Sequence, residues 1–172
     1  MAQVDLTPDC SRCAALCCAA LAFDKGPKFG IDKPAGAPCP NLSPDARCTI
    51  HARLADVGFG GCVAFTCHGA GQRITQEAFG GASWQDDPTL AAPMFSAFQD
   101  ALRIHDLLLL LDEASKLPLP DPAQCAAFRA VLTPDGPMTT TWLRDTLASD
   151  ISARVMAYLQ TLRDVVARTK LL

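Results

Sequence analysis

The stretch Cys-Ser-Arg-Cys-Ala-Ala-Leu-Cys-Cys, residues 10–18, decides what kind of structure this chain can form. It places four thiols within nine residues, and four more cysteines follow by position 67. Zinc prefers four nitrogen or sulfur ligands in a tetrahedron, and iron–sulfur clusters are held by four thiolates. We therefore predict a metal-binding protein whose ligands are the eight clustered cysteines: Cys10, Cys13, Cys17, Cys18, Cys39, Cys48, Cys62 and Cys67.

Eight thiolates exceed the number that one ion needs. They fit two separate four-cysteine sites, or one polynuclear site with bridging sulfurs. The order Cys-x-x-Cys-x-x-x-Cys differs from the radical S-adenosylmethionine pattern and from the ferredoxin run with its trailing Cys-Pro. We expect Zn2+ as the bound metal, with iron or an iron–sulfur cluster as the alternative. Six cations lie nearby in sequence to offset the thiolate charge: Arg12, Lys25, Lys28, Lys33, Arg47 and Arg53.

The alternatives to metal are a disulfide framework and thiols that are merely reactive or buried. The N-terminus reads MAQVDLTPDC and lacks the features of a secretory signal, so we expect a cytoplasmic protein whose thiols stay reduced. The adjacent pair Cys17–Cys18 also favours metal, because helical neighbours point to different sides and do not bridge each other easily.

The composition favours helices over sheets. The chain is 49% hydrophobic but only 6% aromatic, and Ala and Leu dominate its apolar residues. Residues 1–90 are rich in Cys, Gly and Pro, whereas residues 91–172 hold one cysteine and long apolar periodicities. We predict a mainly α fold, with an irregular, metal-stabilised cysteine-rich region (1–90) packed as one unit on a bundle of roughly three helices (91–172).

Three elements are expected in the cysteine-rich region. A helix over residues 7–22 would use Thr7 as its N-cap and Pro8 as its first residue, and would place Cys10, Cys13 and Cys17 on one face. A short helix is expected over 50–56. Residues 58–81 contain many glycines and are expected to form a loop, with a brief strand or turn around 63–66 as an option, in which Gly60 and Gly61 let the backbone approach the sulfurs.

The second half predicts longer helices. Apolar residues three and four apart indicate an amphipathic helix from about 95 that ends before Pro118, followed by a helix over 122–132. A last helix begins near 139–141. At about 30 residues it would be roughly 45 Å long, so we expect either a break near 149–150 or a projecting rod that pairs with another chain. The C-terminal helices are therefore the expected surface for a homo-oligomer or a protein partner.

Several function classes are disfavoured. The net charge is −3 and no run of Lys or Arg is present, so no nucleic-acid partner is expected. The longest apolar run, Leu107 to Leu111, is far shorter than the roughly 20 residues of a membrane span, so no membrane partner is expected. No Ser-His-Asp set, paired catalytic carboxylates or phosphate-binding loop is recognisable. The sequence defines no reaction, and a non-enzymatic role is favoured.

The histidines and the ninth cysteine are weaker candidates. His51 lies three residues after Cys48 and His68 follows Cys67, but each is expected to be a polar residue rather than a ligand. His105 falls on the apolar face of its helix and is expected to hydrogen-bond a carbonyl or a carboxylate. Cys125 lies in an Ala-rich helix and is expected to be a core thiol.

These motifs resemble two groups of proteins. The cysteines from Cys10 to Cys18, with Pro38-Cys39, Cys48-Thr-Ile-His51 and Cys62, resemble the cysteine-cluster family described as zinc- or iron-chelating. The chain departs from that pattern by one extra residue before Cys17, by His51 in place of Tyr, and by Gly-Phe-Gly-Gly before Cys62 in place of an Arg-Pro motif.

A closer resemblance is to the cysteine-rich N-terminal region of actinobacterial pentapeptide-repeat proteins, although no such repeat follows here. The similar stretches are residues 29–39, 58–62, 67–72 and 79–84. The resemblance implies metal chelation by the eight cysteines and no defined reaction. Three roles stay open: a non-catalytic metalloprotein with a structural or regulatory interaction role, an iron–sulfur redox protein or enzyme, and a metal store or chaperone.

Overall fold

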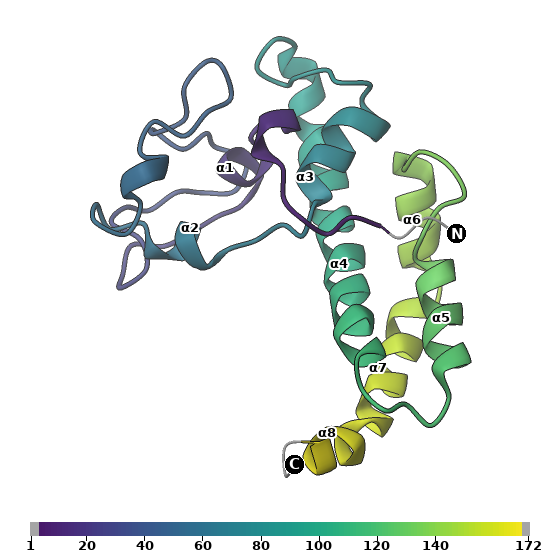
Figure 1. Ribbon diagram of the computed structural model, residues 1–172. Helices are drawn as coiled ribbons and strands as arrows, with labels where there is room; N and C mark the ends of the chain where they lie inside the picture. The colour runs from purple at the N-terminus through teal and green to yellow at the C-terminus, as the bar shows by residue number, and fades with distance from the viewer. Residues whose placement is uncertain (1–3, 170–172) are drawn as a thin grey trace.

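Helix α4, Ala91–Ser115, is the element around which the rest of the chain is arranged (Figure 1). The computed structural model describes residues 4–169. One face of α4 is completely buried and includes Phe98, Ile104 and Leu111. The helices α1, α3, α5, α6 and α7 all contact α4. The apolar positions three and four apart therefore form the core, and the predicted helix before Pro118 is confirmed.

The helical half continues with α5 (Pro122–Val131), α6 (Thr140–Ala148), α7 (Ile151–Thr161) and α8 (Arg163–Thr169). Asp121 begins α5 by accepting hydrogen bonds from the N–H groups of residues 123 and 124. Thr139 begins α6 in the same way by accepting from Trp142. Of the two predicted alternatives, a break near 149–150 or a projecting rod, the break is confirmed at Ser149, whose backbone is extended and whose hydroxyl donates to the carbonyl of Thr146.

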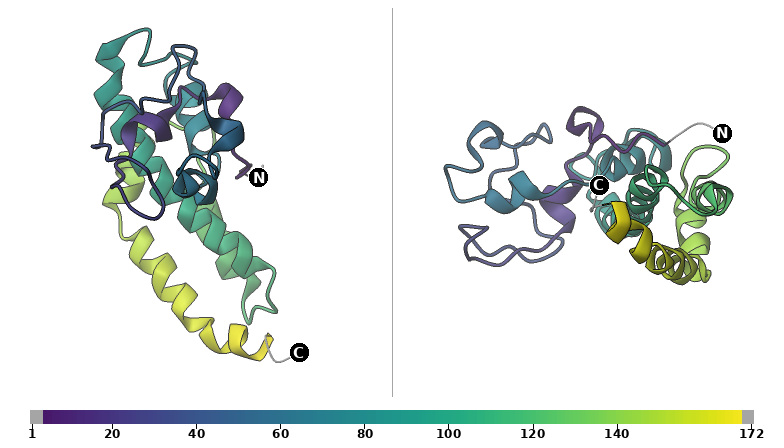
Figure 2. Two further views of the ribbon diagram at one scale, coloured as in Figure 1. Left: turned by 90° about the vertical axis from the view of Figure 1, so that its left-hand side faces the viewer. Right: turned by 60° about the horizontal axis from the view of Figure 1, so that its bottom comes forward.

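The cysteine-rich half consists mostly of loops with short helical turns. Its elements are η1 (Cys10–Arg12), α1 (Leu16–Ala20), η2 (His51–Arg53), α2 (Gly60–Ala64), α3 (Ala70–Arg73), η3 (Ile74–Ala78) and η4 (Pro88–Leu90). The long loops between α1 and α2 lie to one side of the upper part of α4, and α5 to α7 lie on its other side (Figures 1 and 2). The predicted class, mainly α with an irregular cysteine-rich region beside helices, is confirmed.

The predicted helix over residues 7–22 is wrong. Cys13 is extended, and Ala15 adopts a left-handed conformation at φ 53°, which separates η1 from α1. The backbone between them hydrogen-bonds to distant side chains: Ala14 N–H donates to Thr75 Oγ1 at 3.0 Å, and Trp84 Nε1 donates to the Ala14 carbonyl at 2.7 Å. These contacts replace the bonds of a continuous helix. The N-cap is Asp9 and not Thr7.

The predicted loop over residues 58–81 is also wrong, because this stretch contains α2, α3 and η3. Gly58 and Gly69 have φ values of +83° and +80°, and each lies just before one of these helices. The glycines therefore provide the left-handed turns that begin helices. Ala70 and Ile74 are fully buried and belong to the core that α3 and η3 share with α4. Tertiary burial stabilises helices here that local propensity disfavours.

The segment 21–66 has almost no core of its own. Only Lys33, Phe59 and Gly61 are buried in it. Its main apolar contact is a small cluster in which the rings of Phe23 and Phe29 stack at 4.3 Å and Phe59 meets both edge-on. Three isolated antiparallel bridges, between residues 23 and 33, 26 and 29, and 42 and 48, are its regular pairings. Within the described residues no helix is both long and apolar enough to cross a membrane.

Candidate metal centre

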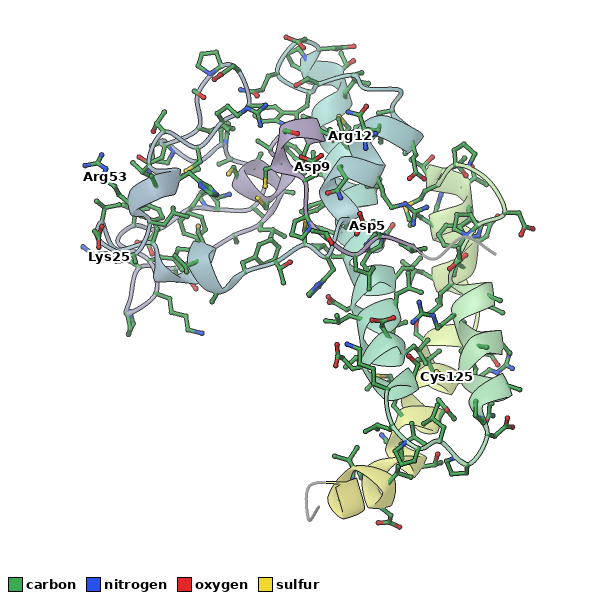
Figure 3. The ribbon with its side chains drawn as sticks, in the orientation of Figure 1. Asp5, Asp9, Arg12, Lys25, Arg53 and Cys125 are labelled. Carbon is green, nitrogen blue, oxygen red and sulfur yellow. The ribbon has the colours of Figure 1, made fainter. Side chains whose placement is uncertain are left out.

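All eight clustered cysteines lie in the cysteine-rich half, around α1 and the loops beside it. Sulfur atoms gather there in Figure 3, whereas Cys125 lies in the helical half. Nine free thiols account for every cysteine of the chain, so the disulfide alternative finds no support in the described residues. The electrostatic interactions among the eight fall mainly into two sets of four, and Cys18 of the second set also acts on Cys10 and Cys17 of the first.

The first set is Cys10, Cys13, Cys17 and Cys67. Burial raises the pKa of Cys10 and of Cys13, and the negative charge of Cys67 raises both further. The pKa of Cys17 is raised by its hydrogen bond to Cys18 and by burial, and then by Cys13 and Cys67 among its neighbours. Cys67 therefore lies close to all three of the others, although it follows the nearest of them by 50 residues in the sequence.

The second set is Cys18, Cys39, Cys48 and Cys62. Burial raises the pKa of Cys62 to about 11, with contributions from the charges of the other three members. Burial also raises the pKa of Cys48, and Cys18 and Cys39 raise it further. The backbone ties this set together, because Cys39 N–H donates to the Cys18 carbonyl at 2.9 Å and Cys48 pairs with Leu42 in a bridge.

The two sets meet at the peptide that joins Cys17 to Cys18. The Cys17 thiol donates a hydrogen bond to the Cys18 sulfur, which lowers the pKa of Cys18 to about 7. Lys33 lowers that pKa as well, against the opposing effect of burial. Consecutive residues of α1 thus belong to different sets, and their two sulfurs are in contact where the sets meet.

Gly71 brings bare backbone against the first set. A Cβ at this position of α3 would lie 2.7 Å from Cys13 Sγ and 3.7 Å from Cys67 Sγ. The first contact is too short for any side chain, so only glycine at position 71 leaves room for the two sulfurs. The glycines expected in this role, Gly60 and Gly61, do not have it: Gly60 faces open space and Gly61 lies against the ring of Phe29. The Gly-Ala-Gly stretch directly after Cys67 was the available signal for Gly71.

Lys33 brings a positive charge to the second set. Only 4% of this residue is exposed, and its ammonium donates to the carbonyls of Ala19, Pro34 and Ala37 at 2.9–3.3 Å. Burial lowers the pKa of Lys33, whereas the thiolate charges of Cys39, Cys18, Cys17 and Cys62 raise it. Among the six nearby cations predicted to offset thiolate charge, Lys33 is the buried one.

The sulfurs are neighbours but do not form closed coordination shells. Within residues 4–169, no group of three or more His, Cys, Asp or Glu side chains is arranged to hold a metal ion. The donor chemistry nevertheless suits a soft cation, because each set offers four thiols. Burial raises the pKa of Cys10, Cys13, Cys48 and Cys62 and so favours their protonated forms, whereas a bound cation favours the opposite because a coordinating thiol loses its proton.

The remaining candidates lie outside both sets. His51 is exposed on η2. His68 lies in a left-handed conformation at φ 46°, and its carbonyl accepts a hydrogen bond from Nδ1 of the fully buried His105. The prediction that His105 bonds a carbonyl is therefore confirmed. Cys125 is also confirmed as a core thiol, because it is buried and its Sγ donates to the Leu111 carbonyl at 3.4 Å.

Comparison with known proteins gives limited information. No protein family matches the chain, and no solved structure matches it. The chain is 40% identical over 118 residues to the uncharacterized protein YybG of Bacillus subtilis strain 168. The aligned residues make up 69% of this chain and 42% of that protein, so the chain spans less than half the length of this relative. The similarity to cysteine-cluster and pentapeptide-repeat proteins therefore stays a prediction.

Proposed function

We propose that this chain is a metal-binding protein that holds two metal ions, Zn2+ in the simplest case, in two adjacent four-cysteine sites. The proposal is supported by the gathering of the eight thiols around α1 and the loops beside it, in two adjoining sets of four. Four thiolates complete the tetrahedral shell of one zinc ion and leave no open position for a substrate. Such closed sites serve folding, so a structural role that supports interactions is favoured over catalysis.

The sparse core of segment 21–66 supports a structural role for the metal. Ordering a residue costs roughly 1–2 kcal/mol of backbone entropy, and this segment buries few apolar side chains in return. Structural zinc sites contribute folding free energy directly. The second set lies within or next to this segment, and the first set links α1 to the start of α3.

Metal analysis of protein purified without oxygen tests the proposal. Two zinc ions per chain, and thiolate-to-metal absorption bands after exchange for Co2+, are expected. Reduced protein without these bands would overturn metal binding through the cysteines. Iron with inorganic sulfide would instead identify an iron–sulfur protein, and more than two weakly held ions would identify a metal store.

Cysteine variants test the division into two sets. Cys67→Ser should remove one of the two ions and Cys48→Ser should remove the other, whereas Cys125→Ser should keep both because Cys125 belongs to neither set. If Cys67→Ser and Cys48→Ser each release both ions, the centre is one polynuclear site instead. Hydrogen exchange after chelation should show lost protection over 21–66 and retained protection in α4, and unchanged protection over 21–66 would argue against a structural metal.

A further inference from the structure

Lys33 is the only lysine or arginine among the described residues that is buried. A buried ammonium normally pairs with a carboxylate, because its charge is costly to remove from water. No ion pair of the described residues involves Lys33. The aromatic face of Phe23 lies 5.3 Å from Nζ, and this cation–π contact offsets a minor part of that cost.

The hydrogen bonds of Lys33 fix its position without neutralising it. Its three N–H donors are matched by three carbonyls, of Ala19 in α1 and of Pro34 and Ala37 in the following loop. Its backbone is held as well, since Lys33 and Phe23 exchange both hydrogen bonds of an antiparallel bridge at 2.8 and 3.0 Å. The ammonium is therefore a fixed point charge beside α1, the helix that carries Cys17 and Cys18.

The groups near this charge that become negative when they bind a metal are sulfurs. Those that interact with Lys33 belong to Cys17, Cys18, Cys39 and Cys62, and three of these are members of the second set. Four thiolates around one divalent ion leave two negative charges in excess. A fixed ammonium next to them cancels one of these charges in a medium where screening by solvent is weak.

The first set has a weaker supply of positive charge among the described residues. Its member Cys17 also interacts with Lys33, and its member Cys10 interacts with Arg47, whose guanidinium donates to the carbonyls of Cys10 and Ser11 at 2.9 and 3.4 Å. Arg47 is exposed, so water and salt screen its charge. The two sets thus contain the same four donors in different electrostatic surroundings.

We infer that Lys33 is the built-in counter-charge of the second set, and that the site formed by Cys18, Cys39, Cys48 and Cys62 consequently binds its metal more tightly than the first site. The inference rests on the proposed function. Lys33 is a positioning residue that acts on the ligands through its charge and does not itself contact the metal.

Zinc affinity measured by competition with a chromophoric chelator tests this inference. Lys33→Met removes the charge and the donors, and Lys33→Gln removes the charge but keeps an N–H group for the carbonyls. Both should weaken the tighter of the two sites by about ten- to a hundredfold, as expected for the loss of one nearby unit charge, and should weaken the other site much less, because only Cys17 of the first set interacts with Lys33. Lys28→Met, at an exposed lysine of the same loop, is the matched control and should change neither.

Combination with the cysteine variants assigns the effect to one set. The loss caused by Lys33→Gln should persist when the first site is removed by Cys67→Ser, and should vanish when the second is removed by Cys48→Ser. The inference is overturned if Lys33→Gln keeps both affinities within about threefold, or if it weakens both sites alike, which would make Lys33 a general structural residue. Wild-type protein that binds no metal through its cysteines would instead overturn the proposed function.

Discussion

Replacing Gly71 by alanine tests whether the first set of cysteines needs the space that this glycine of α3 leaves beside the sulfurs. The new Cβ would lie 2.7 Å from Cys13 Sγ, well inside ordinary van der Waals contact, and 3.7 Å from Cys67 Sγ. Gly71 is buried in α3, and Thr75 and Ile74 fix that part of the chain from the next turn. Because the helix cannot retreat, the Cys13 side chain has to move.

The expected loss of metal affinity in Gly71→Ala follows from two opposing contributions to the free energy. Forcing an extra methyl group into a packed site costs about 1–3 kcal/mol, whereas alanine stabilises a helix by roughly 0.5–1 kcal/mol relative to glycine. Metal–ligand distances tolerate changes of only about 0.2 Å. We therefore expect metal affinity at the first site to fall by about tenfold or more, which corresponds to roughly 1.4 kcal/mol or more. Affinity at the second site should not change.

The assay is stepwise zinc competition combined with Co2+ spectra, which report the thiolate shell directly. Gly60→Ala is the matched control, since Gly60 lies in α2 and its added Cβ would meet nothing within 4 Å. That variant should bind both ions normally. A Gly71→Ala protein with wild-type affinity at both sites would refute the view that α3 shapes the first site.

Two further predictions concern the helical half. Both are measured by urea unfolding of protein from which a chelator has removed the metal. Burial lowers the pKa of His105 to about 4 from 6.5, and the nearby charges of Arg73, Glu77 and His68 contribute smaller effects. As the pH falls below 6.5 the unfolded chain takes up this proton first, so stability should decrease by up to about 3 kcal/mol between pH 6.5 and 4. In the His105→Gln variant the free energy of unfolding should fall less between pH 6.5 and 4. A fall equal to that of the wild-type protein would show that His105 is not the group responsible. Phe98→Ala empties a completely buried site on α4 and should cost about 3–5 kcal/mol; a loss below about 1 kcal/mol would show that α4 is not the core.

The helices that the sequence predicted correctly have signals within a single segment. For α4 the signal is an apolar repeat of three and four residues, and for α5 it is Asp121 followed by proline at the first turn. The break after α6 is one of two predicted alternatives, because one helix to the C-terminus would exceed the width of a small domain and would have to break or project. These signals are local, so one sequence is enough to recognise them.

The errors arose where distant residues determine the backbone. Nothing between residues 10 and 18 indicates that Thr75 and Trp84 bind the backbone of Ala14 and prevent a continuous helix. The glycines near residues 58 and 69 suggested a loop, although burial against α4 stabilises α3 and η3.

For the candidate site, too, the sequence predicts some features and the fold determines the others. The thiol donors are obvious from their types and spacing, whereas their partition depends on the fold. No spacing rule separates Cys17 from Cys18 or assigns Cys67 to the set of Cys10. The importance of Lys33 among six nearby cations is also a matter of burial, which one sequence does not reveal.

The positions of the two sets give them different structural consequences. Cys67 directly precedes His68, whose carbonyl is bound by His105 in the middle of α4, and Cys13 touches the backbone of α3. The first set is therefore attached to the helical core. The second set draws three of its four cysteines from segment 21–66, which has little core of its own. A metal in the first site would therefore join the two halves of the molecule, while a metal in the second would order the loops. If metal occupancy controls a partner surface, the surface formed by these loops is the one that depends on the second site.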